Sequence, residues 1–379
     1  MTFAYTSPTF LVTCSCDELI PLFLLGHSKL VEDQLKCLLQ AQRQHYDAHF
    51  SHVEHQVVLD QPPTATVRLH YVRPDASGEP RFRELAQLLA KYITFYCFTA
   101  ARRKDLTEFE HNEMYMRARD LFRHAANSGQ VGELLIYFLL ETVLNAPQAL
   151  KKMPMTTNPN EERKGSDGVH LLWNANEQVL ELLFAESKIW GSFSRALTDA
   201  FISMDTFHDS RTKAFEINVV TSNFSNLDPT LQTQVKSYIE GENVSRCRLA
   251  QACLIGFDWA EYACLSDTRR AAFLTEFDAR YKAWAAGIRD SLNEKLKAFK
   301  HKHLRFEFFL LPFRDVEAFR SWFEEALTCL RDTGLAEAEK ASVILLVSGY
   351  VRNVGTQEAD IEAAIRASRT APAEALRYE

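Results

Sequence analysis

Residues 179–188 read Val-Leu-Glu-Leu-Leu-Phe-Ala-Glu-Ser-Lys, and this stretch decides the fold. The apolar run at 182–185 predicts a buried strand that leads directly into Glu186. Because side chains along a strand alternate between the two faces of a sheet, Glu186 and Lys188 share one face and Ser187 lies on the other. A buried strand that ends in a carboxylate and an ammonium group is unusual unless the pair has a use. The stretch therefore predicts a strand with a chemical site at its end.

A partner strand is predicted directly before this one. Residues 167–173 form a β-rich run, and the turn Asn-Ala-Asn at 174–176 separates it from the strand at 179–187. A hairpin of these two strands places the carboxylate of Asp167 beside that of Glu186 at the edge of the sheet. The sequence thus predicts a pocket that contains two carboxylates and an ammonium group.

The remaining patterns are typical of an α/β protein. Further strands are predicted at 8–14, 55–60, 65–72, 215–221, 248–257 and 304–312. Helices are predicted at 17–46, 82–100, 106–126, 132–144, 192–207, 228–240, 267–300, 315–331 and 337–352. We expect a core sheet flanked by helices, with an α+β region at the N-terminus.

Composition and missing motifs exclude several classes of protein. Hydrophobic residues make up 46% of the 379 residues and charged residues 25%, which is ordinary for a globular chain. The formal net charge of -7 argues against a protein that coats nucleic acid through its overall field, although a local basic groove can still bind DNA. The sequence has no P-loop, no Gly-rich dinucleotide fingerprint and no Gly-x-Ser-x-Gly elbow. ATP hydrolysis, nicotinamide chemistry and serine-hydrolase chemistry therefore lack support.

The N-terminus and the cysteines indicate the compartment. Residues 1–25 are apolar in part, but no basic region precedes them and Asp17 and Glu18 interrupt them. This pattern fits neither a signal peptide nor a membrane span. The eight cysteines are scattered without a regular spacing, which is typical of a reducing environment. We expect a cytoplasmic protein with no membrane partner.

The predicted pocket suits the hydrolysis of a phosphodiester bond, which needs a cation to neutralise the phosphoryl group and activate water. Magnesium, like manganese, prefers oxygen ligands, keeps several waters and takes one or two carboxylates. Asp167 and Glu186 supply these, and the main-chain carbonyl of Ser187 adds a third ligand. Lys188 orients the attacking water or balances charge. Glu133, at the start of an apolar helix, is expected to reach the same pocket and hold a second ion or an ordered water.

A simpler interpretation stays open at this point. Residues 165–168, Gly-Ser-Asp-Gly, have the composition of a turn, and Glu186 with Lys188 can be an exposed ion pair. The other Glu-x-Lys match, Glu162 and Lys164, lies in a polar loop without a strand to hold it. Because Glu186 instead follows an apolar strand, the pattern favours a site.

A basic loop precedes Asp167 and is a candidate contact for a phosphate backbone. It covers residues 148–165. Solvated loops have a similar composition, so both interpretations remain. The basic residues in question are Lys151, Lys152, Arg163 and Lys164.

Three stretches together carry a family resemblance. Gly132-Glu133 opens the apolar helix, residues 165–170 read Gly-Ser-Asp-Gly-Val-His, and residues 184–188 read Phe-Ala-Glu-Ser-Lys. The arrangement resembles HamA, the nuclease component of the bacterial Hachiman anti-phage system, and is similar to the related anti-phage protein AbpA. The resemblance covers residues 125–260. One departure is that Ser166, and not proline, precedes the aspartate.

The resemblance implies a PD-(D/E)xK fold, related to restriction endonucleases, and a magnesium-dependent nuclease that acts on DNA. It implies a superfamily 2 helicase, HamB, as the partner that works with the nuclease and restrains it. The catalytic residues that it implies are Glu133, Asp167, Glu186 and Lys188.

From these observations we predict three sections of chain. Residues 1–124 form the region that docks the partner, 125–312 the nuclease core, and 313–379 a helical section. Two alternatives remain open. The chain can be an inactive adaptor with a nuclease fold that anchors a helicase or nucleic acid, or an RNase with the same metal site.

Overall fold

The structure, a computed structural model, describes 31–59, 63–122, 129–150, 165–209, 213, 217, 247–262 and 270–328 of the 379 residues. The chain divides into two compact units, residues 1–323 and 324–379. The second unit is described only at 324–328. The sheet and all described site residues belong to the first unit.

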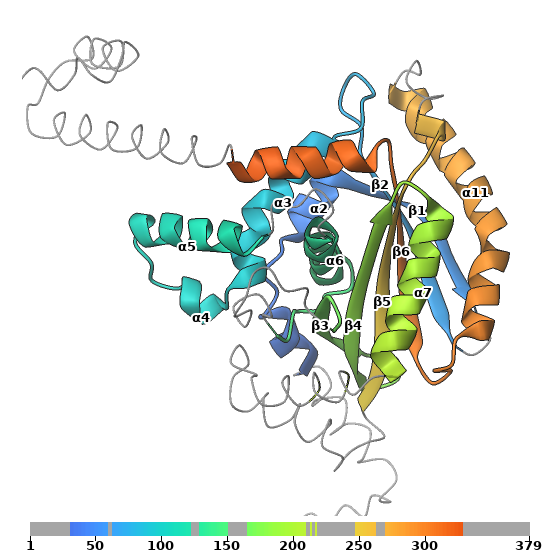
Figure 1. The fold of residues 1–379 in the computed structure, drawn as a ribbon, viewed down its shortest axis with the longest axis horizontal. Helices are drawn as coiled ribbons and strands as arrows, with labels where there is room; N and C mark the ends of the chain where they lie inside the picture. The colour runs from blue at the N-terminus through green and yellow to red at the C-terminus, as the bar shows by residue number, and fades with distance from the viewer. Residues whose placement is uncertain are drawn as a thin grey trace, which may run out of the picture. The chain divides into compact units, whose positions relative to one another are not determined.

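A six-stranded mixed sheet organises the first unit (Figure 1). Its spatial order is β1-β2-β6-β5-β4-β3. The four inner strands run parallel to one another, whereas the edge strands β1 and β3 are antiparallel to their neighbours. The strands are β1 (Phe50–Leu59), β2 (Ala65–Val72), β3 (Gly168–Asn174), β4 (Val179–Trp190), β5 (Cys247–Asp258) and β6 (Arg305–Phe313).

Helices cover both faces of this sheet (Figure 1). On one face lie α7 (Phe193–Asp209) and α11 (Arg270–Ala298). On the other lie α2 (Arg43–His49), α3 (Phe82–Cys97) and α6 (Gln130–Val143), while α4 (Ala100–Arg103) and α5 (Glu108–Leu121) extend away from the sheet. A further helix covers 316–328. The predicted α/β sheet flanked by helices is therefore confirmed.

The alternation of side chains along β4 decides which helix covers which residue. Phe184 faces α7, where its ring centroid lies 4.9 Å from that of Phe207. Ser187 and Ile189 face α6, because a Cβ built on Gly132 would lie 2.9 Å from Ser187 Oγ and 3.3 Å from Ile189 Cδ1. Both faces of this central strand are buried, as in other parallel sheets covered by helices.

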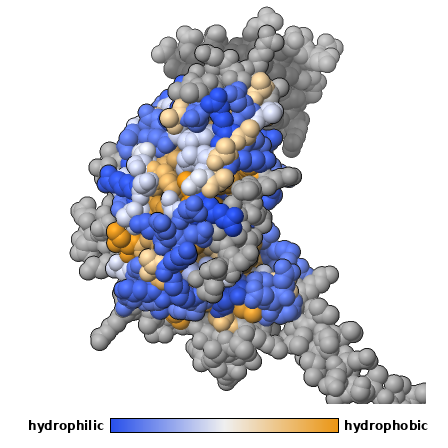
Figure 2. Space-filling view, turned by 90° about the vertical axis from the view of Figure 1, so that its right-hand side faces the viewer, coloured by the Kyte–Doolittle hydropathy of each residue, from blue (hydrophilic) through white to orange (hydrophobic). Residues whose placement is uncertain are grey.

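The outer surface is mainly polar on the side of α7 and α11. Figure 2 views this side, where hydrophilic residues predominate and hydrophobic residues form smaller patches. None of the helices within the described ranges is both long and apolar enough to cross a membrane.

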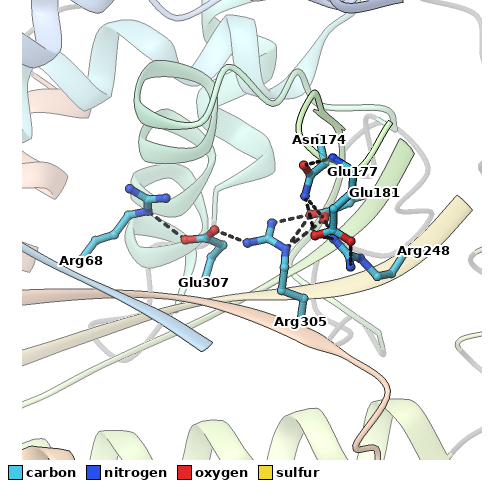
Figure 3. A network of polar contacts seen from close by, with 7 residues as sticks. All are labelled: Arg68, Asn174, Glu177, Glu181, Arg248, Arg305 and Glu307. Carbon is cyan, nitrogen blue, oxygen red and sulfur yellow. Dashed lines mark hydrogen bonds and ion pairs between the residues drawn. The ribbon is translucent and has the colours of Figure 1, made fainter. Parts of the chain in front are cut away.

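A network of charged side chains joins strands across the sheet (Figure 3). Glu181, which is fully buried, accepts hydrogen bonds from Arg248 and Arg305. Glu307 bonds the same Arg305 and also Arg68, whose Nε lies 2.8 Å from Glu307 Oε2. Arg68 comes from β2, so the network connects the N-terminal strands to β4, β5 and β6. Buried charges are tolerated where each has such partners.

Most predicted elements are confirmed. The strands predicted at 65–72, 248–257 and 304–312 are β2, β5 and β6. The helices predicted at 82–100, 106–126, 132–144, 192–207 and 267–300 are α3, α5, α6, α7 and α11. The helix predicted at 315–331 is present over 316–328. Elements predicted at 8–14, 228–240 and 337–352 lie outside the described residues.

The continuous helix predicted at 17–46 is wrong in its described part. Residues 31–36 are helical, the chain then turns, and α2 begins only afterwards. The reason is a partner distant in sequence: Oε2 of Glu141 accepts hydrogen bonds from the main-chain nitrogens of Gln40 and Ala41, each at 2.7 Å. Because the Glu141 side chain satisfies these two N–H donors, they need no carbonyl partner within a helix, and the helix ends before them.

Three strand predictions also need correction. β4 extends past Ser187 to Trp190 because it stays paired with β5 up to that residue. β1 begins at Phe50, five residues before the predicted 55, because Phe50 pairs with Val72 of β2. The strand predicted at 215–221 is wrong at its one described residue, Ile217, which is helical.

The predicted division at residues 124 and 312 stays a prediction about function. β1 and β2 precede residue 124, and they share one sheet with the strands that follow it.

Candidate functional site

The β3–β4 hairpin positions the candidate site. Gly168, the first residue of β3, pairs with Ala185 of β4, and the main-chain nitrogen of Asp167 donates to the Ala185 carbonyl at 2.9 Å. Asp167 therefore lies at the start of β3, next to Glu186 on β4. The hairpin that the sequence predicts is confirmed.

The carboxylate of Asp167 is held by Ser187. Its Oδ2 accepts hydrogen bonds from the main-chain nitrogen of Ser187 at 2.7 Å and from the Ser187 hydroxyl at 2.8 Å. Hydrogen bonds to an ionised carboxylate are among the stronger ones in proteins. Ser187 was expected to contribute only its carbonyl oxygen to a metal, and the sequence pattern did not reveal that it also orients the aspartate.

Glu186 and Lys188 form a partly buried ion pair on the face covered by α7. Lys188 Nζ lies 2.6 Å from Glu186 Oε1, and the side chains are 25% and 8% exposed. The Ser203 hydroxyl of α7 also hydrogen-bonds Glu186. The simpler interpretation expected an exposed pair, and in that respect it is wrong. A buried pair is costly to form, because both charges lose water.

Burial and charge shift both ionisations. Burial, with the nearby charge of Asp167, raises the pKa of Glu186 to about 8, although Lys188 and Ser203 oppose the shift. Burial lowers the pKa of Lys188, but Glu186 and Asp167 outweigh it and leave that pKa above its ordinary value. Lys188 is therefore a cation at neutral pH and suits charge balance or water orientation better than proton abstraction. A metal ion that binds Glu186 has to displace a proton.

Glu133 lies in the first turn of α6 and is linked to the hairpin through Tyr96. The Tyr96 hydroxyl, on α3, donates to Glu133 Oε2 at 3.0 Å and lies 3.3 Å from the main-chain oxygen of Asp167. The missing side chain of Gly132 lets α6 approach β4 closely. The hydroxyl group of Tyr96 thus connects the Glu133 carboxylate to the main chain of Asp167. Sequence reasoning missed Tyr96, since an apolar helical run offers no signal for this contact.

The donor set suits a hard cation. Asp167 and Glu186 supply carboxylate oxygens. Ser187, the residue between Glu186 and Lys188, has a main-chain carbonyl oxygen of the same hard type. Over the described parts of the chain, His, Cys, Asp and Glu do not form a group of three able to hold a metal. Magnesium keeps several waters and needs only one or two carboxylates. A cation would also relieve the repulsion from Asp167, which adds to the larger effect of burial in raising the pKa of Glu186.

The predicted phosphate contacts are not described by the structure. The four basic residues of the loop, Lys151, Lys152, Arg163 and Lys164, all lie outside the described residues. One described basic side chain lies at the same end of β4 as the site. Arg195 of α7 stacks over the ring of Trp190 at 4.1 Å, and its side chain is 63% exposed. An arginine five residues after a tryptophan, with a strand end between them, gives no signal of this contact in the sequence.

Comparison with known proteins identifies the family. No curated protein matches the chain. The family model for HamA matches residues 45–327, a span that contains all six strands of the sheet. The match extends well beyond the 125–260 over which the motifs resemble that family. The chain belongs to the HamA family, and this membership supports a role in Hachiman-type defence.

Proposed function

We propose that this protein is a metal-dependent DNA nuclease of the PD-(D/E)xK type that serves as the effector of a Hachiman-type system. The observation that carries the proposal is the convergence of Asp167, Glu186 and Lys188 at one end of the β3–β4 hairpin. An acid at the start of one strand and Glu-x-Lys on its neighbour support the PD-(D/E)xK assignment. Membership of the HamA family supports the biological context.

Each residue has a distinct role in this proposal. Asp167 and Glu186, with the carbonyl oxygen of Ser187, would hold Mg²⁺ or Mn²⁺, and Glu133 would hold a second ion or an ordered water. The cation would supply charge neutralisation at the phosphoryl group and a nucleophilic water at neutral pH. Lys188, which stays protonated, orients that water and balances the negative charge of the two carboxylates.

The substrate and the partner follow from the same proposal. DNA would approach the end of β4, where the exposed Arg195 can contact phosphates. The basic residues that precede Asp167 in the sequence, Lys151, Lys152, Arg163 and Lys164, are the further phosphate contacts that we propose. A superfamily 2 helicase is the proposed partner, and it would restrain the nuclease until it is needed. The region 1–124 is the proposed docking region.

The test is a cleavage assay on the full chain, alone and with the co-purified helicase. Plasmid DNA, linear DNA and RNA are incubated with magnesium, manganese or a chelator. The site variant is Glu186→Ala/Lys188→Ala. The matched control is Asp209→Ala/Lys300→Ala, which removes an exposed ion pair of the same length, 2.6 Å, outside the proposed docking region.

We expect metal-dependent cutting of DNA by the wild type and by the control, and none by the site variant with its fold retained. Cutting of RNA alone would establish the RNase. If the wild type and the site variant give the same result in the cleavage assay and both still bind the helicase, the protein is an inactive adaptor and the proposed nuclease function is wrong.

A further inference from the structure

We propose that Tyr96 is a positioning residue of the candidate site, an inference that rests on the proposed nuclease function. Its hydroxyl lies 3.0 Å from Glu133 Oε2 and 3.3 Å from the main-chain oxygen of Asp167. The hydroxyl oxygen of Tyr96 is thus within hydrogen-bonding distance of two site residues that come from different segments of the chain. Tyr96 itself comes from a third segment, helix α3.

The position of this hydroxyl is fixed by packing. Tyr96 is only 2% exposed. Its ring packs against those of Tyr137 and Phe122, at centroid distances of 5.4 and 6.2 Å. A side chain that is buried and packed in this way has little rotational freedom, so its hydroxyl holds a fixed position relative to its partners.

The hydroxyl has one proton and two acceptors. The shorter distance, and the greater strength of a bond to a carboxylate, favour donation to Glu133. The Asp167 carbonyl shares the same proton at the longer distance. Tyr96 thereby sets the direction of the Glu133 carboxylate relative to the turn that carries Asp167. This is the geometry that two groups need if they are to share metal ions or ordered waters.

Tyr92 provides a matched control on the same helix. It lies one turn before Tyr96 and is 4% exposed. Its hydroxyl accepts from the main-chain nitrogen of Gln42 at 3.0 Å and lies 2.7 Å from His45 Nδ1, and neither partner belongs to the site. Tyr92→Phe and Tyr96→Phe therefore remove the same atom from the same helix, and only Tyr96→Phe removes it from the site.

The experiment compares these two variants with the wild type in the full chain, together with the co-purified helicase. Cleavage of linear DNA is measured over a range of magnesium concentrations. Binding of Mn²⁺ is measured in parallel by electron paramagnetic resonance, which requires no catalysis. Thermal unfolding confirms that both variants are folded.

For Tyr96→Phe we expect the half-saturating metal concentration to rise about tenfold or more, because outer partners of metal ligands typically contribute this much. The cleavage rate should recover at high magnesium, which loss of stability alone would not produce. Tyr92→Phe should stay within about twofold of the wild type in both measurements.

The outcomes separate this inference from the function on which it rests. Equal metal dependence of the two Phe variants overturns the role of Tyr96 while the nuclease stands. A uniform loss of rate at every magnesium concentration, with weaker folding, also overturns it and makes Tyr96 structural. If the wild type neither binds Mn²⁺ nor cuts nucleic acid, the proposed function fails and this inference falls with it.

Discussion

The carboxylate of Asp167 accepts two hydrogen bonds from Ser187, one from its main-chain nitrogen at 2.7 Å and one from its hydroxyl at 2.8 Å. The residue between the glutamate and the lysine thus orients the aspartate across the hairpin. Ser187 projects to the opposite face of β4 from Glu186 and Lys188, yet the carboxylate that it orients lies close enough to Glu186 for its charge to raise the pKa of that residue further.

We predict that Ser187→Ala weakens the site without destroying it. The main-chain bond to Asp167 remains, so the loss of one hydrogen bond should lower the free energy of unfolding by about 1 kcal/mol. Cleavage should fall by about tenfold as Asp167 gains freedom. Thr206→Ala, which removes an exposed hydroxyl of α7, is the control and should leave cleavage unchanged. Wild-type cleavage by Ser187→Ala would show that the main-chain bond alone orients the carboxylate.

The close approach of α6 to β4 depends on Gly132. A Cβ at this position would lie 2.9 Å from Ser187 Oγ and 3.3 Å from Ser187 Cβ, so Gly132→Ala must displace either the Ser187 side chain that orients Asp167 or the helix that carries Glu133. We expect a loss of about 1–3 kcal/mol of stability, typical of overpacking, together with weaker cleavage. The control is Gly287→Ala in α11, where a Cβ meets nothing within 4 Å and should stabilise the helix by about 0.5–1 kcal/mol.

The crowding at Gly132 can be tested further in the same denaturant experiments. Ser187→Ala removes the oxygen that a new Cβ would meet, so Gly132→Ala should cost less in the Ser187→Ala background than in the wild type. Strictly additive effects of the two changes would contradict this contact.

Metal binding should depend on pH through Glu186. The pKa of this carboxyl is raised to about 8, chiefly by burial, so most of it carries a proton at neutral pH in the metal-free protein. Because a cation binds the ionised form, the affinity should rise by about tenfold per unit between about pH 6 and about pH 8 and level off above that. Calorimetry in two buffers should detect release of about one proton per cation near neutrality. A flat pH profile would exclude Glu186 as the group that metal binding deprotonates.

The charge network of Figure 3 should contribute to stability far more than ion pairs on the surface do. Glu181→Ala removes the fully buried carboxylate that Arg248 and Arg305 share, and it leaves Arg305 with Glu307 and Arg248 with the exposed Glu177. We expect a loss of about 3 kcal/mol. Glu79→Ala removes the exposed pair with Arg314 and should cost about 1 kcal/mol or less. Chemical denaturation of both variants measures the difference. Similar losses for the two would mean that the network is no stronger than a surface pair.

Local patterns predicted the core of the site, whereas contacts between distant segments did not show in the sequence. The shared face of Glu186 and Lys188 follows from the period of a strand, and the short turn after Trp173 predicts the hairpin that brings Asp167 close. The hydroxyl of Tyr96 reaches Asp167 only because α3 packs beside α6, and helical periodicity carries no information about that packing. For the same reason the break before α2, which Glu141 causes, was not predictable from residues near it.

The parallel pairing of β6 between β2 and β5 determines the order in which the sheet can be completed during synthesis. Ala65 pairs with Phe306, so the ribosome must add some 240 residues before the first half of the sheet has its neighbour. A nascent chain that stops short of Arg305 already contains Glu133, Asp167, Glu186 and Lys188, yet it has no strand to join the two halves. Assembly of the complete sheet around the candidate site is therefore deferred until β6 has emerged.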